Sequence, residues 1–338
     1  MLAGSIAFLL IGFVILIYAG DCLVRGALAA AYKANISPLL VGILIVGFGT
    51  SMPEFLIAIQ ATLAGNTGLA HGNIIGSNIA NIWLVLALPA VIFPISTVAP
   101  RMRLTAVFML LVTIAWMVIT VFFGLTPVIG MAFLGVLLVY AAIAWFINRE
   151  DHTEDTPEEK QMMATPFWRM MTLILIGLVG LPLGSKLLVE AGLSLAKDTG
   201  IREEVVGLTL LAVGSSLPEL GAGIAAAVRR QSDVAMGNIL GANIFNILGV
   251  GGVVSVLAPN STHALSPEFT GYSNWVMGLA ALMITLVVLL RRRVGVATGA
   301  VFLVLYGVYI LGLVYDWTID DLIYSVIQRP GGAVAPAQ

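Results

Sequence analysis

The sequence predicts an all-α integral membrane protein with ten transmembrane helices arranged as two inverted five-helix repeats. Hydrophobic residues fill 59% of the 338 positions and charged residues only 10%, which excludes a soluble globular domain. Ten apolar runs are separated by Pro, Gly and charge clusters, and about 20 apolar residues suffice to cross a bilayer. One motif-bearing segment also recurs 165 residues further along the chain, which indicates an internal duplication.

Each apolar run is predicted to form one span. The first run begins MLAGSIAFLL and lacks the basic segment of a cleaved signal peptide, so it is predicted to be the first helix. The predicted spans are 3–30, 38–64, 70–94, 104–123, 127–147, 168–196, 204–229, 234–257, 273–290 and 297–315. Cys22 is the single cysteine, so no disulfide can form within the chain.

The duplicated segment places a carboxylate inside each of two hydrophobic runs. GTSMPE at 49–54 recurs as GSSLPE at 214–219, and GNIIGSNIAN at 72–81 recurs as GNILGANIFN at 237–246 without a gap. Five spans per repeat is an odd number, so the second copy is inverted in the membrane, as in many secondary transporters. The predicted organisation is a first repeat at 1–147 with its motif at 47–81, a cytoplasmic linker at 148–167, a second repeat at 168–328 with its motif at 212–246, and a disordered tail at 329–338.

Basic residues predict the orientation. When loops are assigned to the two faces alternately, one face receives 11 of the 16 Lys and Arg residues. They are Lys33, Arg101, Arg103, Arg149, Lys160, Arg169, Arg229, Arg230, Arg291, Arg292 and Arg293. By the positive-inside rule this face is cytoplasmic, and both termini lie outside the cytoplasm of a cell inner-membrane protein.

Glu54 and Glu219 are the residues most indicative of function. A buried carboxylate in a membrane needs a counter-charge, and no Lys or Arg lies within either motif. A hard cation is the natural partner because the surrounding polar groups are oxygen donors or amides. Thr50 and Ser215 each lie four residues before a glutamate and share its helix face. A proline before each glutamate frees a backbone carbonyl, that of Gly214 in the second copy, and such carbonyls can coordinate cations.

The following span of each repeat offers amides and small residues. Asn81 and Asn246 each lie 27 residues after a glutamate and are predicted to face the cation site. Asn73, Asn78, Asn238 and Asn243 fit equally well as site residues or as hydrogen-bonding links between helices. Four glycines with small-xxx-small spacing are predicted to bring this span against the preceding one: Gly72, Gly76, Gly237 and Gly241.

Two further groups of charges are predicted to be structural. Asp21 with Arg25, and Lys186 with Glu190, are opposite charges four residues apart on one helix and are expected to pair.

With these two motifs, the chain resembles the cation/calcium antiporter superfamily, specifically the short prokaryotic sodium/calcium exchangers with two α-repeats. The resemblance covers essentially the whole chain. It implies a calcium site at Thr50, Glu54, Ser215 and Glu219. It implies coupling-ion sites lined by these glutamates together with Gly47, Ser51, Ser77, Asn81, Ala212, Ser216 and Asn246. The family often has Asp at the position of Asn246 and Ser at that of Ala242, so the sodium stoichiometry does not carry over.

The predicted function is secondary antiport of cytoplasmic Ca²⁺ against external Na⁺ by alternating access, with no cofactor and no enzymatic activity. The expected partners are Ca²⁺, Na⁺ or H⁺ and the lipid bilayer, with no nucleic acid, and no protein partner can be deduced. A calcium/proton antiporter using the same site is the alternative, because protons could also neutralise two glutamates. An ion channel is disfavoured because the motifs converge on one occluded place. An intramembrane protease is disfavoured because no His base accompanies Thr50 or Ser216 within the motifs.

Overall fold

The protein is helical throughout the part that the computed structural model describes, which is residues 2–147, 157–199, 214–258 and 272–314. Ile95 and Val294 form an isolated antiparallel bridge, and no β-strand occurs in these ranges. Seven helices are long and apolar enough to cross a membrane, or eight if a bent pair counts as one span. The all-helical membrane fold is therefore confirmed, and the integral membrane location follows from these spans.

The first half contains these elements: α1 (Leu2–Ala34), α2 (Pro38–Val41), the π-helix η1 (Gly42–Gly47), α3 (Phe48–Thr50), α4 (Met52–Leu63), α5 (Thr67–Ala80), the π-helix η2 (Asn81–Leu86), α6 (Ala87–Ile92), α7 (Met102–Val118), the π-helix η3 (Ile119–Phe123) and α8 (Pro127–Ile147). The helix α9 (Pro157–Met163) lies in the predicted linker.

The second half contains these elements: α10 (Phe167–Thr199), α13 (Leu217–Val228), α14 (Ser232–Phe245), the π-helix η5 (Asn246–Val250), α15 (Gly251–Leu257), α16 (Asn274–Leu289) and α17 (Val296–Val314). The bounds of α13 are those of α4 shifted by 165 residues, the offset of the sequence motif, and the bounds of α14 are those of α5 shifted by the same number. The start of the predicted span 204–229 and the predicted tail lie outside the described residues.

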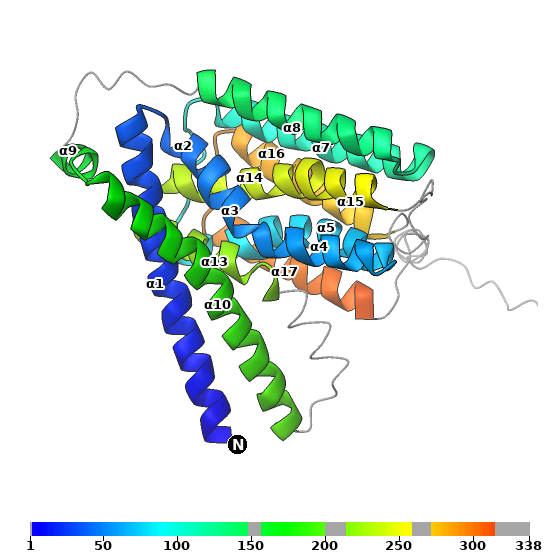
Figure 1. Ribbon diagram of the computed structural model, residues 1–338, viewed down its shortest axis with the longest axis horizontal. Helices are drawn as coiled ribbons and strands as arrows, with labels where there is room; N and C mark the ends of the chain where they lie inside the picture. The colour runs from blue at the N-terminus through cyan, green and yellow to red at the C-terminus, as the bar shows by residue number, and fades with distance from the viewer. Residues whose placement is uncertain (1, 148–156, 200–213, 259–271, 315–338) are drawn as a thin grey trace, which may run out of the picture.

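The helices α1 and α10 lie side by side and cross the other helices at a steep angle (Figure 1). Glycines allow this close contact, because a Cβ added at Gly12 would lie 3.1 Å from the Leu188 side chain. Gly177, 165 residues after Gly12, packs in the same way against Leu23, whose counterpart at that offset is Leu188. The paired contacts indicate a local two-fold relation between α1 and α10.

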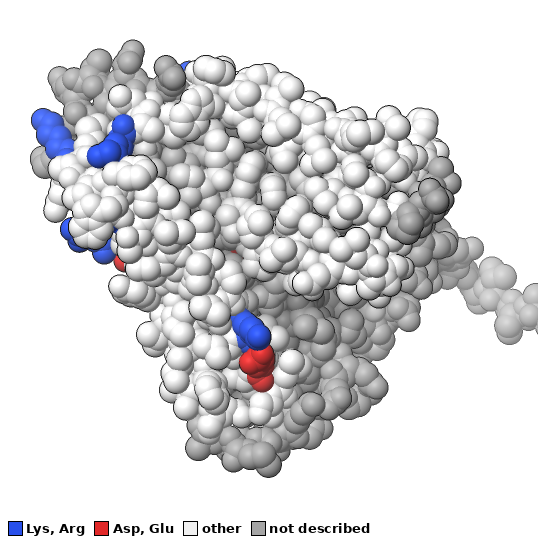
Figure 2. All heavy atoms as spheres, viewed as in Figure 1, with Lys and Arg blue, Asp and Glu red and all other residues white. Residues whose placement is uncertain are grey.

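Polar contacts join segments that the sequence assigns to the cytoplasmic face. The Lys33 Nζ atom donates to the Thr165 carbonyl, at 3.4 Å. Also at a loop of the predicted cytoplasmic face, Ser96 N–H donates to Ser232 Oγ, at 3.0 Å. Figure 2 shows Lys and Arg side chains gathered near α9 and the end of α1, while most of the remaining described surface in that view is uncharged. Loops that the sequence assigns to one face are thus also neighbours in space.

Candidate cation site

The helix that carries each glutamate starts after an interruption at a serine. Helices Pro38–Thr50 and Met52–Leu63 are bent by 43° around Ser51, whose backbone has φ −80° and ψ 6°. Ser216 has nearly the same conformation, with φ −90° and ψ 7°. The prolines do not sit mid-helix. They fall at the start of α4 and α13, where proline is well tolerated because its missing N–H has no helical partner.

This local structure places both glutamates in the first turn of a helix. Glu54 lies in the first turn of α4 and Glu219 in that of α13. The N-terminus of a helix favours negative charge because its N–H groups point outward along the axis. Both side chains are buried, at 1% and 0% exposure. The break therefore supplies partial positive charge at the place where two acids are withdrawn from solvent.

The two carboxylates lie close enough to interact electrostatically, and hydroxyl groups cross between the two halves to reach them. Ser51 Oγ donates to Glu219 Oε1 at 2.9 Å. Thr50 also lies beside Glu219, and Ser215 lies beside Glu54. The sequence places Thr50 on the face of its own Glu54, whereas in the structure each hydroxyl is next to the glutamate of the opposite repeat.

Three of the four carboxylate oxygens have no hydrogen-bond partner among the described residues. These are both oxygens of Glu54 and Oε2 of Glu219. Leaving a buried carboxylate oxygen without a partner is costly. A cation that binds between the two carboxylates would satisfy all three oxygens at once. No group of three or more His, Cys, Asp and Glu that could hold a metal ion occurs in the described ranges.

A matched pair of asparagines ties each motif helix to the next span. Asn73 Nδ2 donates to the Glu54 carbonyl at 3.0 Å, and Asn238 Nδ2 donates to the Glu219 carbonyl at 3.1 Å. Asn238 Oδ1 also accepts from Thr50 Oγ1 at 3.4 Å. The two residues act as links between helices, one of the two alternatives that the sequence leaves open.

The asparagines one turn further along form a second link, across the repeats. Asn81 Nδ2 donates to Asn243 Oδ1 at 3.0 Å, and Asn243 Nδ2 donates to the Asn78 carbonyl at 3.4 Å. Asn78 Nδ2 in turn donates to the Ile74 carbonyl at 2.7 Å. The Asn81 Oδ1 atom remains without a partner in the described structure.

The remaining predicted coupling-ion residues are mostly buried near these groups. Ser77, Ser216 and Asn246 are at most 4% exposed. Neither amide atom of Asn246 nor Ser216 Oγ has a partner in the ranges described. The Gly47 carbonyl accepts from Ser51 N–H at 3.3 Å, and Ala212 lies outside the described residues.

The glycines bring together spans from opposite repeats. A Cβ at Gly241 on α14 would lie 2.6 Å from the Ile43 Cα on η1, and one at Gly47 would lie 2.7 Å from the Asn238 carbonyl oxygen. Gly237 packs in the same way against Gly42. The sequence expects contacts with the preceding span of the same repeat, but these contacts join the second repeat to the first. No described residue lies within 4 Å of a Cβ built on Gly76, and the roles predicted for Gly72 and Gly76 stay predictions.

Two polar contacts near the motif helices could not be predicted from the sequence: one to the Gly214 carbonyl and one between Asp21 and Arg229. Ser185 Oγ donates to the Gly214 carbonyl at 2.6 Å, so that carbonyl already has a partner. The predicted pairs Asp21–Arg25, at 3.8 Å, and Lys186–Glu190, at 3.7 Å, are both present. Asp21 forms a further, shorter ion pair with Arg229 at the end of α13. Partners separated by 208 residues cannot be found from spacing along a helix.

Comparison with known proteins identifies the family. The model for sodium/calcium exchanger protein matches in two blocks, residues 4–146 and 170–315. The chain is 33% identical over 310 residues to the putative antiporter CaxA of Alkalimonas amylolytica, covering 90% of this chain and 97% of the relative. It is 26% identical to the sodium/calcium exchanger MaX1 of Methanosarcina acetivorans, covering 93% of this chain and 100% of MaX1.

Solved structures agree with the sequence relatives. The sodium-calcium exchanger NCX_Mj superimposes with a TM-score of 0.78 at 30% identity, covering 93% of this chain and 100% of NCX_Mj. The relatives are ion exchangers and not enzymes. The chain therefore belongs to the sodium/calcium exchanger protein family and is a membrane ion antiporter of this type.

Proposed function

We propose that the protein exchanges cytoplasmic Ca²⁺ for external Na⁺, with Glu54 and Glu219 as shared ligands of both ions. The observation that carries this proposal is the pair of buried carboxylates, one from each repeat, with three oxygens that lack a protein partner. Two carboxylates neutralise one divalent ion. The names of MaX1 and NCX_Mj, which both specify sodium and calcium, support the choice of ions.

The proposed calcium ligands are Thr50, Glu54, Ser215 and Glu219, because both hydroxyls lie next to a carboxylate. The coupling ions use the same glutamates together with neutral donors around them: Gly47, Ser51, Ser77, Asn81, Ala212, Ser216 and Asn246. Unpartnered oxygens at Asn81, Ser216 and Asn246 support this second set. Hard cations prefer such oxygen ligands.

Exchange follows from the cost of leaving the two acids uncompensated. After Ca²⁺ leaves, two buried carboxylates repel each other in a low-dielectric site. The site therefore changes its exposed face only when Ca²⁺, Na⁺ or protons compensate this charge. This requirement couples the outward movement of one ion to the inward movement of the other.

The proposed architecture is two inverted repeats, 1–147 and 168–328, joined by the linker 148–167. The repeated bounds of α4, α5 and α13, α14, the two blocks of the family match and the two-fold contacts between α1 and α10 support it. Movement of α1 and α10 against the motif helices would then open the site alternately to each face. The proposed orientation, with both termini outside the cytoplasm of the inner membrane, rests on the distribution of basic residues.

Calcium uptake into proteoliposomes under separately imposed sodium and proton gradients tests the proposal. Uptake should follow the sodium gradient, whereas uptake that follows only the proton gradient would support the calcium/proton alternative. Glu54→Gln and Glu219→Gln should each abolish uptake, because each removes one of the two charges that balance Ca²⁺. Glu190→Gln is a suitable control because it makes the same chemical change at an exposed carboxylate outside the site, one that pairs with Lys186 on its own helix. Full transport by either glutamate variant would exclude the proposed site.

A further inference from the structure

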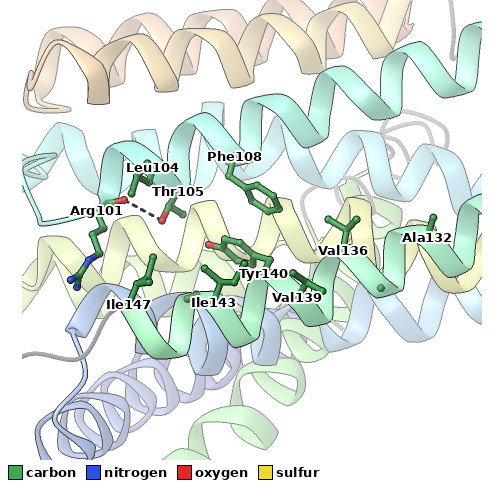
Figure 3. A pocket seen from close by; sticks show the side chains of 12 residues that line it. Arg101, Leu104, Thr105, Phe108, Ala132, Val136, Val139, Tyr140, Ile143 and Ile147 are labelled. Atoms are coloured by element: carbon green, nitrogen blue, oxygen red, sulfur yellow. Dashed lines mark hydrogen bonds between the residues drawn. The ribbon is translucent and has the colours of Figure 1, made fainter.

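A groove runs between α7 and α8 on the surface of the bundle (Figure 3), and neither of the two glutamates lines it. Its volume is about 590 Å³. Phe108 of α7 and Tyr140 of α8 stack in parallel inside it, with ring centroids 4.3 Å apart. Both helices are long and apolar enough to cross a membrane. The apolar side chains of Val136, Val139 and Ile143 in the groove are exposed, so the groove opens toward the lipid.

One end of the groove is polar and positively charged. Arg101 lies there, immediately before α7, and its side chain is exposed. Among the described residues that line the groove there is no Asp or Glu, and Arg101 is the charged one. Arg101 belongs to the loops that the sequence assigns to the cytoplasmic face, and it precedes the membrane-spanning helix α7.

Two hydroxyl groups follow Arg101 along the groove. Thr105 lies one helical turn further along α7, and the ring of Tyr140 faces it from α8 (Figure 3). The Tyr140 hydroxyl is buried and close enough to Thr105 to interact with it, but it forms no hydrogen bond of standard geometry with a described residue. A buried phenol usually has a polar partner. An ester group of a bound molecule would satisfy it at this depth.

The rest of the groove is apolar and long. From Ile147, beside Arg101, to Ala132 the lining follows α8 for about 22 Å at a rise of about 1.5 Å per residue. One leaflet of hydrocarbon is roughly 15 Å deep. Gly135 leaves the floor open, since a Cβ built there meets nothing within 4 Å. The groove thus has room for an extended acyl chain.

We propose that this groove binds one phospholipid with an anionic head group from the cytoplasmic leaflet. The phosphate pairs with the Arg101 guanidinium, which suits phosphate oxygens in geometry and charge. The ester region lies at Thr105 and Tyr140, and one acyl chain extends past Val136 toward Ala132. A basic pocket between spans on the cytoplasmic side is a recurrent arrangement for anionic lipids. This site is independent of the cation chemistry proposed above.

Native mass spectrometry of the full-length protein in detergent tests the site with two probes, phosphatidylglycerol and phosphatidylcholine with the same acyl chains. The wild type should retain one phosphatidylglycerol more strongly than phosphatidylcholine. Arg101→Gln should weaken phosphatidylglycerol retention by roughly fivefold, the effect of one basic residue at a lipid surface. Gly135→Leu should displace both lipids because its side chain fills the groove.

Two matched variants control for general effects. Arg103→Gln removes a neighbouring charge that does not line the groove and instead donates to the Leu289 carbonyl at 3.0 Å. Gly307→Leu adds the same bulk at another exposed glycine with no neighbour within 4 Å. Both should retain lipid as the wild type does. Equal retention of the two lipids, or unchanged retention in Arg101→Gln and Gly135→Leu, would overturn the proposal.

Discussion

Gly241→Ala should damage the cation site although residue 241 contributes no ligand. The added Cβ would lie 2.6 Å from both Cα and O of Ile43. Ordinary contacts of this kind begin at 3.4 Å, so α14 and η1 must separate by about 0.8 Å or more. Both partners are backbone atoms of packed helices, and neither can rotate away.

The separation reaches the site through one hydrogen bond. Thr50 Oγ1 to Asn238 Oδ1 is already 3.4 Å long, which is near the limit for a hydrogen bond. Moving α14 away breaks this contact. Thr50 stays with η1, because its hydroxyl also donates to the Val46 carbonyl at 2.9 Å. Glu219 instead follows α14 through the bond that Asn238 Nδ2 donates to its carbonyl, so the distance between Thr50 and Glu219 changes. Overpacking a core costs about 1–3 kcal/mol, and a misplacement of about 1 Å at a functional site can cost roughly 100-fold in rate. We expect a loss of stability in this range and up to that loss in calcium uptake.

Thermal unfolding in detergent and calcium uptake by proteoliposomes measure the two effects. Gly307→Ala is the control, because it makes the same change in a helix at an exposed site without a close neighbour. It should gain up to about 1 kcal/mol from helix propensity. If Gly241→Ala instead unfolds and transports like the wild type, the contact between α14 and η1 does not fix the geometry of the site.

Three further predictions use simpler measurements. Without cations, Ser51→Ala should lower the free energy of unfolding by about 1–2 kcal/mol, because the Glu219 carboxylate loses its hydrogen-bond donor. The hydroxyl of Ser216 has no described partner, so Ser216→Ala should change the free energy of unfolding by less than about 0.5 kcal/mol. Equal effects of the two variants would contradict this difference between the two serines. Calcium at 100 times its dissociation constant should raise the free energy of unfolding of the wild type by about 2.7 kcal/mol, and a chelator should reverse this increase. An equal increase in Glu54→Gln would contradict the assignment of Glu54 as a calcium ligand. A membrane-permeant maleimide should label Cys22, which is 2% exposed, only after denaturation; rapid labelling of the folded protein would show that α1 is not packed as described.

The sequence predicts the helices well because hydropathy depends on local composition. The span predicted at 127–147 coincides with α8, and the predicted span 234–257 differs by two residues from the helical stretch that begins at Ser232 and ends at Leu257. In a bilayer each span has to satisfy its own backbone, so the apolar run and the helix nearly coincide. The 43° break at Ser51, inside the predicted span 38–64, is one exception. The π-helical turns of η1, η2 and η5 are another. They widen the helix near the site without any distinctive residue pattern.

The sequence identifies the two glutamates of the candidate site but not the contacts between the repeats around them. The duplication identifies Glu54 and Glu219, and burial of both is confirmed. Spacing along a helix relates Thr50 only to its own motif, whereas the structure joins Ser51 to Glu219 across 168 residues. Local periodicity cannot reveal such crossings because they depend on how the two repeats are packed. The same limit applies to Gly241, which packs against η1 of the opposite repeat.

The ion pair between Asp21 and Arg229 is a stabilising contact without an equivalent at the corresponding positions of the two repeats. It joins α1 to α13, and Gly20 on α1 packs closely on Gly221 nearby. At the repeat offset the corresponding residues are Lys186 and Ala64, which cannot form such a pair. If the two halves exchange their packing when the protein switches faces, the Asp21–Arg229 attraction exists in only one of the two states. A single ion pair outside the transport site would therefore bias the side of the membrane to which the empty site is open.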